Sequence, residues 1–217
     1  MDNKLIMKLL LTSAGLAGEI GQKLLSWLDK EPGQTKVGYI PTAIEVEEDK
    51  SYAEVDRKEL VDLGFQVKDI DIKDSGYHDQ LDDCDVIYIE GGNTFYLLGH
   101  VRKSGFDIKL KSLLESGKIY VGVSAGSILM GKSIEVSKYG DKDQFDVTDF
   151  SGLEYVPFSI TPHYNQDLED GKAEKIKAFA QAGDPLVAIT DSQAVLVEDD
   201  KVSIIGPGEQ CLWNTEL

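Results

Sequence analysis

The amino-acid sequence predicts an α/β fold in which a mostly parallel β-sheet is covered by helices on both faces. Short apolar segments alternate with helix-like segments along most of the chain, as they do in βαβ units. Glycine-rich turns follow several of the apolar segments directly. The length of 217 residues suits one domain with a sizeable core. We therefore expect a single α/β domain over residues 1–217.

Strands are expected where short runs of apolar residues stand between turn residues. They span residues 5–12, 36–42, 65–70, 85–90, 118–123, 158–161 and 186–190. Two further segments, residues 194–198 and 202–205, flank Asp199-Asp200 and predict a β-hairpin.

Helices are expected over residues 16–28, 52–63, 95–101, 107–115 and 171–182. Gly64 ends the second of these helices and Ser116-Gly117 ends the fourth, because glycine readily adopts the conformation that follows a helix C-terminus. Residues 138–157 are polar and irregular, which is typical of either a functional lid or a solvated loop.

The most informative stretch is residues 118–130, where Gly122-x-Ser124-x-Gly126 follows a strand and precedes a helix. This nucleophile-elbow pattern raises a serine hydroxyl above the end of a parallel sheet. The helix that follows directs its free N–H groups toward the site, so the Ala125 N–H is a candidate oxyanion donor. The pattern is short and also occurs by chance. The strand before it and the helix after it favour a catalytic serine.

A second turn, Gly91-Gly92-Asn93-Thr94, also follows a strand directly. The carboxyl ends of parallel strands lie at one edge of the sheet, so this turn and Ser124 are expected to meet there. The Gly92 N–H is then the candidate second donor of an oxyanion hole. Asn93 and Thr94 are candidates for substrate binding, with helix capping as the alternative.

A serine nucleophile needs a base, and histidine is the usual one. His78 lies in a polar stretch and His100 lies on a predicted helix, whereas His163 directly follows the strand at residues 158–161. Position therefore favours His163 as the base, with a loop histidine at a strand end as the alternative.

The base in turn needs an acid that holds its tautomer. Asp191 follows the strand at residues 186–190 and is the preferred candidate, although an ordinary turn residue would look the same. Glu135 and Asp141 lie closer to Ser124 in the sequence and stay open as alternatives.

Composition argues against several kinds of partner. The formal net charge of −17 disfavours nucleic acids and anionic membranes. Lys8 interrupts the apolar run near the N-terminus, so we expect no signal peptide, and no apolar run is long enough to span a bilayer. Cys84 and Cys211 lack C-x-x-C spacing, which indicates a cytoplasmic protein without disulfides or a zinc site.

Two other ligand sites have little support in the sequence. Residues 13–18 form a glycine-rich turn, but their spacing is not that of a dinucleotide-binding G-x-G-x-x-G loop, so we prefer a tight turn. The aspartates of residues 138–157 do not have the spacing of an EF-hand calcium loop. We therefore expect no cofactor and no metal.

Four motifs occur in the order found in the peptidase E family, which comprises aspartyl dipeptidases and their cyanophycinase relatives. They are Gly91-Gly92-Asn93-Thr94, Gly122-Val123-Ser124-Ala125-Gly126, Thr161-Pro162-His163-Tyr164 and Thr190-Asp191-Ser192. The chain resembles this family over most of its length. The resemblance implies a three-layer flavodoxin-like fold, related to class I glutamine amidotransferases but with serine at the elbow. It also implies hydrolysis of a small peptide without metal or cofactor.

The resemblance places Ser124 in the nucleophile position and His163 in the base position. A family acid shortly after the elbow falls near Tyr139 here, which is not an acid, and a second family position near the C-terminus matches Asp191. This departure favours Asp191 as the third member.

The resemblance further implies a preference for an N-terminal aspartate, which requires a cation. Arg102 is the candidate, with Lys132 and Lys138 as alternatives. The sequence also leaves open an amidase or esterase that uses the same triad, and a non-catalytic binding module on this fold. A homodimer is open as well.

Overall fold

The structure is a computed structural model that describes residues 7–217. The strands are β1 Lys8–Thr12, β2 Lys36–Ile40, β3 Gln66–Asp69, β4 Val86–Ile89, β5 Ile119–Val123, β6 Ser159–Thr161, β7 Leu186–Ala188, β8 Ala194–Glu198, β9 Lys201–Ile205 and β10 Cys211–Trp213. The helices are α1 Glu19–Ser26, α2 Ser51–Asp62, α3 Tyr77–Asp82, α4 Thr94–Ser104, α5 Phe106–Glu115, α6 Ala125–Leu129, α7 Tyr164–Glu169 and α8 Ala173–Gln181.

Within residues 7–217, the main sheet has seven strands in the order β3-β2-β4-β5-β1-β8-β9. The five strands from β3 to β1 are parallel, whereas β8 runs antiparallel to β1 and β9 antiparallel to β8. β4 and β5 are neighbours, with Ile89 opposite Gly122. The turns that follow these two strands therefore emerge side by side.

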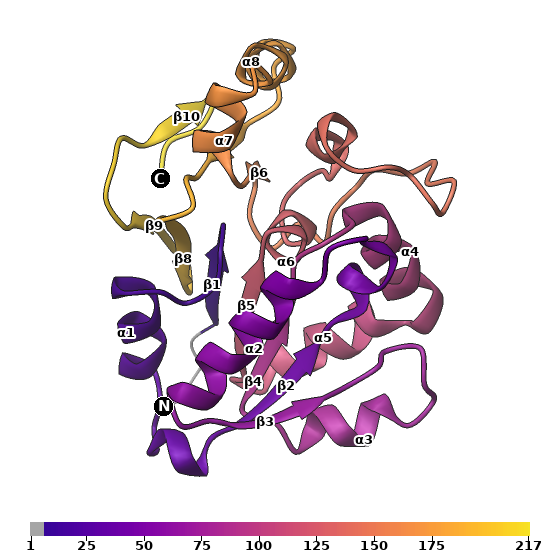
Figure 1. Cartoon of the computed structure of the whole chain (residues 1–217), viewed down its shortest axis with the longest axis vertical. Helices are drawn as coiled ribbons and strands as arrows, with labels where there is room; N and C mark the ends of the chain where they lie inside the picture. Colours follow the sequence, from indigo (N-terminus) through magenta and orange to yellow (C-terminus); the bar gives the residue numbers. More distant parts are fainter. Residues whose placement is uncertain (1–6) are drawn as a thin grey trace.

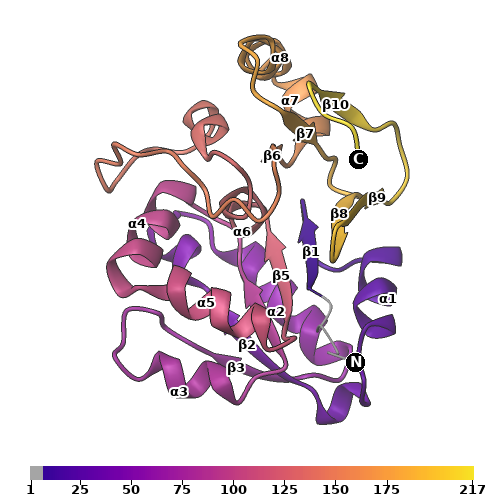
Figure 2. The same cartoon turned by 180° about the vertical axis from the view of Figure 1, so that it is seen from behind.

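Helices cover both faces of this sheet, because side chains alternate between the faces along each strand. Leu10 of β1 packs with buried residues of α1 and α2, whereas Leu9 and Leu11 pack with those of α3, α4, α5 and α6. Figure 1 shows α2 in front of the sheet, and Figure 2, seen from behind, brings α4 and α5 to the front. The predicted three-layer α/β fold with a mostly parallel sheet is confirmed.

A second, three-stranded sheet has the order β10-β7-β6 within the described residues. With α7 and α8 it lies beyond the carboxyl ends of β1 and β5, at the top of Figure 1. The sequence predicts that the strands before His163 and Asp191 belong to the main sheet and end at its carboxyl edge. This prediction is wrong, because both strands lie in the second sheet. The hairpin strand β8 pairs along the whole of β1, so that edge is occupied. β6 and β7 pair with each other instead.

Three short elements were not expected from the sequence: α3, α7 and β10. Each has six residues or fewer, too few for a clear hydrophobic period. The first expected strand begins at residue 5, and its first two residues lie outside the described part of the chain. Residues 140–157 form a long loop that follows a 3-10 helix at Glu135–Tyr139.

The long loop is held against α4. Phe145 packs edge-on against the rings of Tyr96 and His100, and Phe150 packs against Phe95. The Asn93 amide also donates to the Lys142 carbonyl, at 2.9 Å. The loop is therefore one wall of the region above the carboxyl ends of β4 and β5.

Candidate active site

Ser124 occupies a tight turn between β5 and α6. Its backbone has φ 46° and ψ −104°, a conformation that residues other than glycine rarely adopt. A Cβ at Gly122 would lie 2.5 Å from the Gly126 carbonyl oxygen, and one at Gly126 would lie 2.5 Å from that of Ile89. The two glycines thus let strand, turn and helix pack closely enough to hold Ser124 in this strained position.

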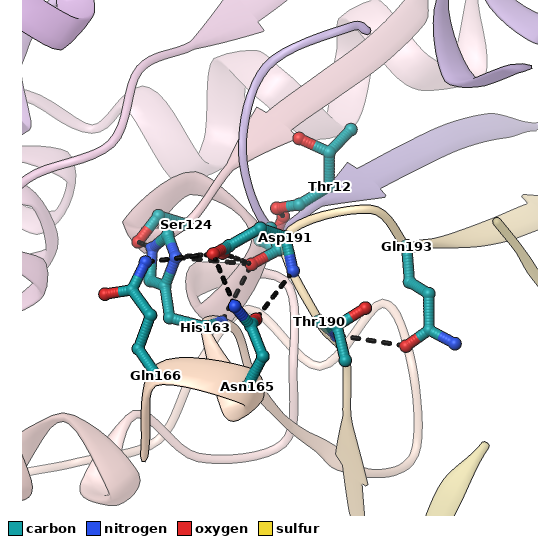
Figure 3. Close-up of polar contacts among 10 residues, drawn as sticks. Thr12, Ser124, His163, Asn165, Gln166, Thr190, Asp191 and Gln193 are labelled. Carbon is teal, nitrogen blue, oxygen red and sulfur yellow. Dashed lines mark hydrogen bonds and ion pairs between the residues drawn. The ribbon is translucent and has the colours of Figure 1, made fainter. Parts of the chain in front are cut away.

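His163 lies beside Ser124, brought there by the turn between β6 and α7. It has a left-handed backbone, φ 59°, and immediately precedes α7. Its Nε2 is 3.0 Å from the Ser124 Oγ, and its Nδ1 is 2.6 Å from Oδ1 of Asp191. Figure 3 shows the three side chains in this order. A carboxylate on Nδ1 keeps the proton there and leaves Nε2 free to accept the serine proton.

Asp191 is held by a dense set of donors. Its Oδ2 accepts hydrogen bonds from the side-chain amides of Asn165 and Gln166, both at 2.9 Å, and its backbone N–H donates to the Asn165 Oδ1 at 3.0 Å. Burial alone would raise the pKa of Asp191, but the bonds from Asn165, Gln166 and His163 lower it overall. Asp191 is therefore ionised whenever His163 acts as a base.

Ser13 completes the group and was not singled out by the sequence. Its fully buried hydroxyl accepts the backbone N–H of His163 at 2.8 Å and donates to Oδ1 of Asp191 at 3.1 Å. Ser13 follows β1, the neighbour of β5, so the sheet-edge argument applied to Ser124 could have located it. Asn165 and Gln166 lie on α7, a helix too short to be predicted.

The two candidate oxyanion donors are both free in the part of the chain that the structure describes. Gly91 donates its N–H to Glu90, Asn93 to the Ala43 carbonyl and Thr94 to Asp141, whereas the Gly92 N–H has no acceptor among residues 7–217. Ala125 is the first residue of α6, and its N–H is likewise without an acceptor there. Two unpaired N–H groups beside a serine hydroxyl are what an oxyanion hole requires.

The Gly92 backbone packs closely against the Ala43 carbonyl. Its φ is 128°, and a Cβ on Gly92 would lie 2.4 Å from the Ala43 carbonyl oxygen, so only glycine fits. Glu90, two residues before Gly92, is fully buried. Its Oε1 accepts the Gly91 N–H and its Oε2 accepts the Tyr39 hydroxyl, both at 2.7 Å. Glu90 thus orients the peptide that precedes the candidate oxyanion donor.

Two of the three predicted substrate-binding residues, Asn93 and Arg102, have side-chain partners within the protein. The Asn93 Oδ1 accepts the Tyr96 N–H at 3.0 Å and so caps α4, as its alternative predicted. Thr94 lines a cavity beside Ser124. Arg102 binds the carbonyl and carboxylate of Asp149 in the long loop, at 2.7 and 3.1 Å, and lines neither of the cavities at Ser124. Substrate binding by these residues stays a prediction.

The other charged candidates are also paired. Lys132 lies 3.5 Å from Asp184, and Lys138 lies 2.6 Å from Glu135. Asp141 accepts the Thr94 N–H at 2.8 Å, and burial raises its pKa. Of the three acids left open by the sequence, Asp191 is the one whose carboxylate contacts the Nδ1 of His163.

Two cavities meet at Ser124. The smaller, about 160 Å³, lies toward α6 and α8 and includes Thr94, Tyr139, Asp141 and Lys172 in its wall. The larger, about 530 Å³, lies toward the turn after β1 and the start of α2.

A serine hydroxyl that contacts a half-buried His–Asp pair, with the unpaired N–H groups of Gly92 and Ala125 in the adjacent turns, is an arrangement for acyl transfer. The comparison with known proteins gives this arrangement a family. The model of "Peptidase family S51" matches residues 9–205. The chain belongs to peptidase family S51. It is therefore a serine-type peptidase, as the four motifs predict.

Individual members of the S51 group agree with this placement. An uncharacterised peptidase of Listeria monocytogenes is 32% identical over 171 residues, covering 76% of this chain and 83% of that protein. A peptidase E of Shewanella amazonensis is 30% identical over 171 residues, covering 69% and 72%. A crystal structure described as a peptidase E protein from Listeria monocytogenes superposes with a TM-score of 0.82 at 27% identity, covering 94% of this chain and all of that one.

Among residues 7–217, no group of three or more His, Cys, Asp or Glu side chains is arranged to hold a metal ion. Over the same residues, no helix has the length and apolar character needed to cross a bilayer.

Proposed function

We propose that this S51 peptidase is a serine exopeptidase, a dipeptidase, in which Ser124 is the nucleophile, His163 the base and Asp191 the acid that orients it. The observation that carries the proposal is the unbroken series of contacts from Ser124 Oγ to His163 Nε2 and from His163 Nδ1 to Asp191, at 3.0 and 2.6 Å. Each distance is within hydrogen-bonding reach without any rearrangement.

In the proposed reaction, His163 takes the proton of Ser124 as the hydroxyl oxygen attacks the scissile carbonyl carbon. The Gly92 and Ala125 N–H groups stabilise the negative charge that develops on the carbonyl oxygen. His163 then gives its proton to the leaving amine, which departs as the acyl-enzyme forms. A water molecule, deprotonated by His163, hydrolyses the ester and restores Ser124.

The preference for short peptides is supported by the walls around Ser124. The long loop is tied to α4 by the Asn93–Lys142 and Arg102–Asp149 bonds. Its residues Gly140 and Asp141 line the cavities at Ser124, so the loop limits the space beside the serine. The resemblance to peptidase E also implies a preference for an N-terminal aspartate, and that preference would need a cation beside Ser124. Lys172 is the one Lys or Arg side chain in the described walls of the two cavities, and Asp170 lies 3.6 Å from it.

The test is release of free amine from a panel of dipeptides, with wild type and Ser124→Ala measured side by side. Ser124→Ala removes one small polar group, so the variant is expected to fold normally. We expect hydrolysis of some dipeptides by the wild type and a loss of at least about 10³-fold in the variant. Hydrolysis of simple amides or esters but of no peptide would replace the dipeptidase by an amidase or esterase. No turnover of any substrate would favour a binding module.

A further inference from the structure

The larger cavity beside Ser124 is strongly acidic. We define the acidic cavity as the space of about 530 Å³ between Ser124 and the start of α2. Its wall contains Glu47, Asp56, Asp141 and Asp191, and no Lys or Arg among the described residues that line it. Asp191 already serves His163 and Asp141 already accepts the Thr94 N–H. Glu47 and Asp56 remain as carboxyls that face the cavity without a basic partner within 4 Å in the described chain.

The proton affinities of the cavity groups report the same negative potential. Burial, then Glu90 and Glu59, raises the pKa of Asp56 to about 8. Burial, then Asp141, raises the pKa of Glu47. Carboxyl pKa values rise in this way when the groups are removed from water and when like charges lie nearby without a counter-ion. The cavity also opens onto the nucleophile, so its occupant during the reaction is part of the substrate.

We infer that the acidic cavity binds a positively charged group of the substrate, so that the enzyme prefers dipeptides with lysine or arginine next to the scissile bond. This inference rests on the proposed dipeptidase function and names its substrate class. An ammonium or guanidinium group would supply a counter-ion for Glu47, and beside Asp56 it would favour the ionised carboxylate that burial and Glu90 disfavour. The cavity volume accommodates a long basic side chain, and the apolar part of that chain can lie against the ring of Tyr52, which is also in the wall.

The same charges oppose an aspartate side chain in this cavity, because it would add a further carboxylate to an unrelieved cluster. The smaller cavity offers one cation, Lys172, in a wall that also contains Asp141, Asp167 and Asp170. A basic residue therefore finds a more complementary site beside Ser124 than an acidic residue does.

The test separates binding from catalysis. Dissociation constants of lysyl-leucine and norleucyl-leucine, and of leucyl-lysine and leucyl-norleucine, are measured by calorimetry on Ser124→Ala, which cannot turn them over. Norleucine has the side chain of lysine without the ammonium group, and both members of a pair have the same termini. We expect the lysine peptide to bind about tenfold or more tightly in at least one pair, since a charge-assisted hydrogen bond is at stake.

Charge-neutral variants locate the effect. Adding Glu47→Gln or Asp56→Asn to Ser124→Ala is expected to reduce the lysine-to-norleucine ratio at least threefold. Glu48→Gln is the matched control, because Glu48 is an exposed neighbour outside the cavity wall, and it should leave the ratio unchanged. Equal binding within both pairs, tighter binding of aspartyl-leucine, or a ratio insensitive to Glu47 and Asp56 would overturn the inference.

Turnover by the wild type distinguishes this failure from failure of the proposed function. Hydrolysis of dipeptides without a preference for lysine or arginine would overturn the inference and leave the dipeptidase standing. Tight binding of lysine peptides without hydrolysis of any peptide would keep the cationic site and overturn the dipeptidase.

Discussion

Replacing Asp191 by asparagine is expected to lower kcat by about 10²- to 10⁴-fold while KM changes little. In the wild type, Oδ1 of Asp191 accepts hydrogen bonds from His163 and Ser13. Its Oδ2 accepts hydrogen bonds from Asn165 and Gln166. Asparagine has one oxygen, so one of these pairs must face its NH₂ group. If the NH₂ group faces Asn165 and Gln166, two hydrogen bonds are lost. If it faces Ser13 and His163, the Ser13 hydroxyl can turn and accept, and the histidine bond is kept only if Nδ1 gives up its proton and accepts instead.

The second orientation is therefore favoured, and it has a chemical consequence. The NH₂ group opposite Nδ1 makes His163 carry its proton on Nε2, which then cannot accept the proton of Ser124. The smaller expected loss of kcat, about 10²-fold, corresponds to loss of the charge-assisted hydrogen bond to the imidazolium. Such a bond contributes about 1.5–3 kcal/mol, or roughly 10- to 100-fold in rate. The wrong tautomer raises the loss to about 10⁴-fold.

The assay is the initial rate of amine release from the best dipeptide, with the melting temperature measured on the same samples. Glu135→Gln is the matched control, because Glu135 is the acid that the sequence left open and that pairs with Lys138. It should keep kcat within about twofold. An Asp191→Asn enzyme that keeps more than a third of the wild-type kcat, or a Glu135→Gln enzyme that loses as much, would refute the reasoning.

Three further predictions concern single groups. Gly92→Ala places a Cβ 2.4 Å from the Ala43 carbonyl oxygen, so the turn must move and kcat should fall about 10²-fold or more; a normal kcat would show that the Gly92 N–H is not a donor. Ser13→Ala removes the bonds to Asp191 and the His163 N–H and should lower kcat about tenfold with KM retained; a change in KM alone would contradict its positioning role. The pKa of Asp56 is about 8 in the folded chain and about 3.9 when unfolded. The folded state then binds more protons between these values, so stability falls as pH rises through them. The melting temperature should drop from pH 5 to 8 more steeply in the wild type than in Asp56→Asn, and equal slopes would contradict the shift.

Much of the fold and the central three residues follow from the sequence, because their signals are local. Gly122-x-Ser124-x-Gly126 specifies its own turn, since its glycines are required by contacts with adjacent backbone. His163 was chosen from three histidines by its place after a strand. His163 is the histidine whose ring contacts Ser124, whereas His78 stacks on Tyr77 and His100 packs against Tyr96.

What the sequence could not supply depends on pairing between distant segments. The strands before His163 and Asp191 form their own small sheet, since β8 occupies the free edge of β1, and strand partners cannot be read from hydrophobic pattern alone. Ser13 reaches Asp191 across 178 positions of sequence. The acidic cavity is also invisible in the sequence, because Glu47 and Asp56 belong to separate segments with no motif in common.

The proposed role of Ser124 as the nucleophile is tested most directly by labelling with a serine-directed fluorophosphonate, followed by intact mass and peptide mapping of wild type and Ser124→Ala. We expect one adduct per wild-type chain, on Ser124, with loss of peptidase activity in step with labelling, and no adduct on the folded variant. An adduct on another residue, or peptide hydrolysis by Ser124→Ala at the wild-type rate, would contradict it.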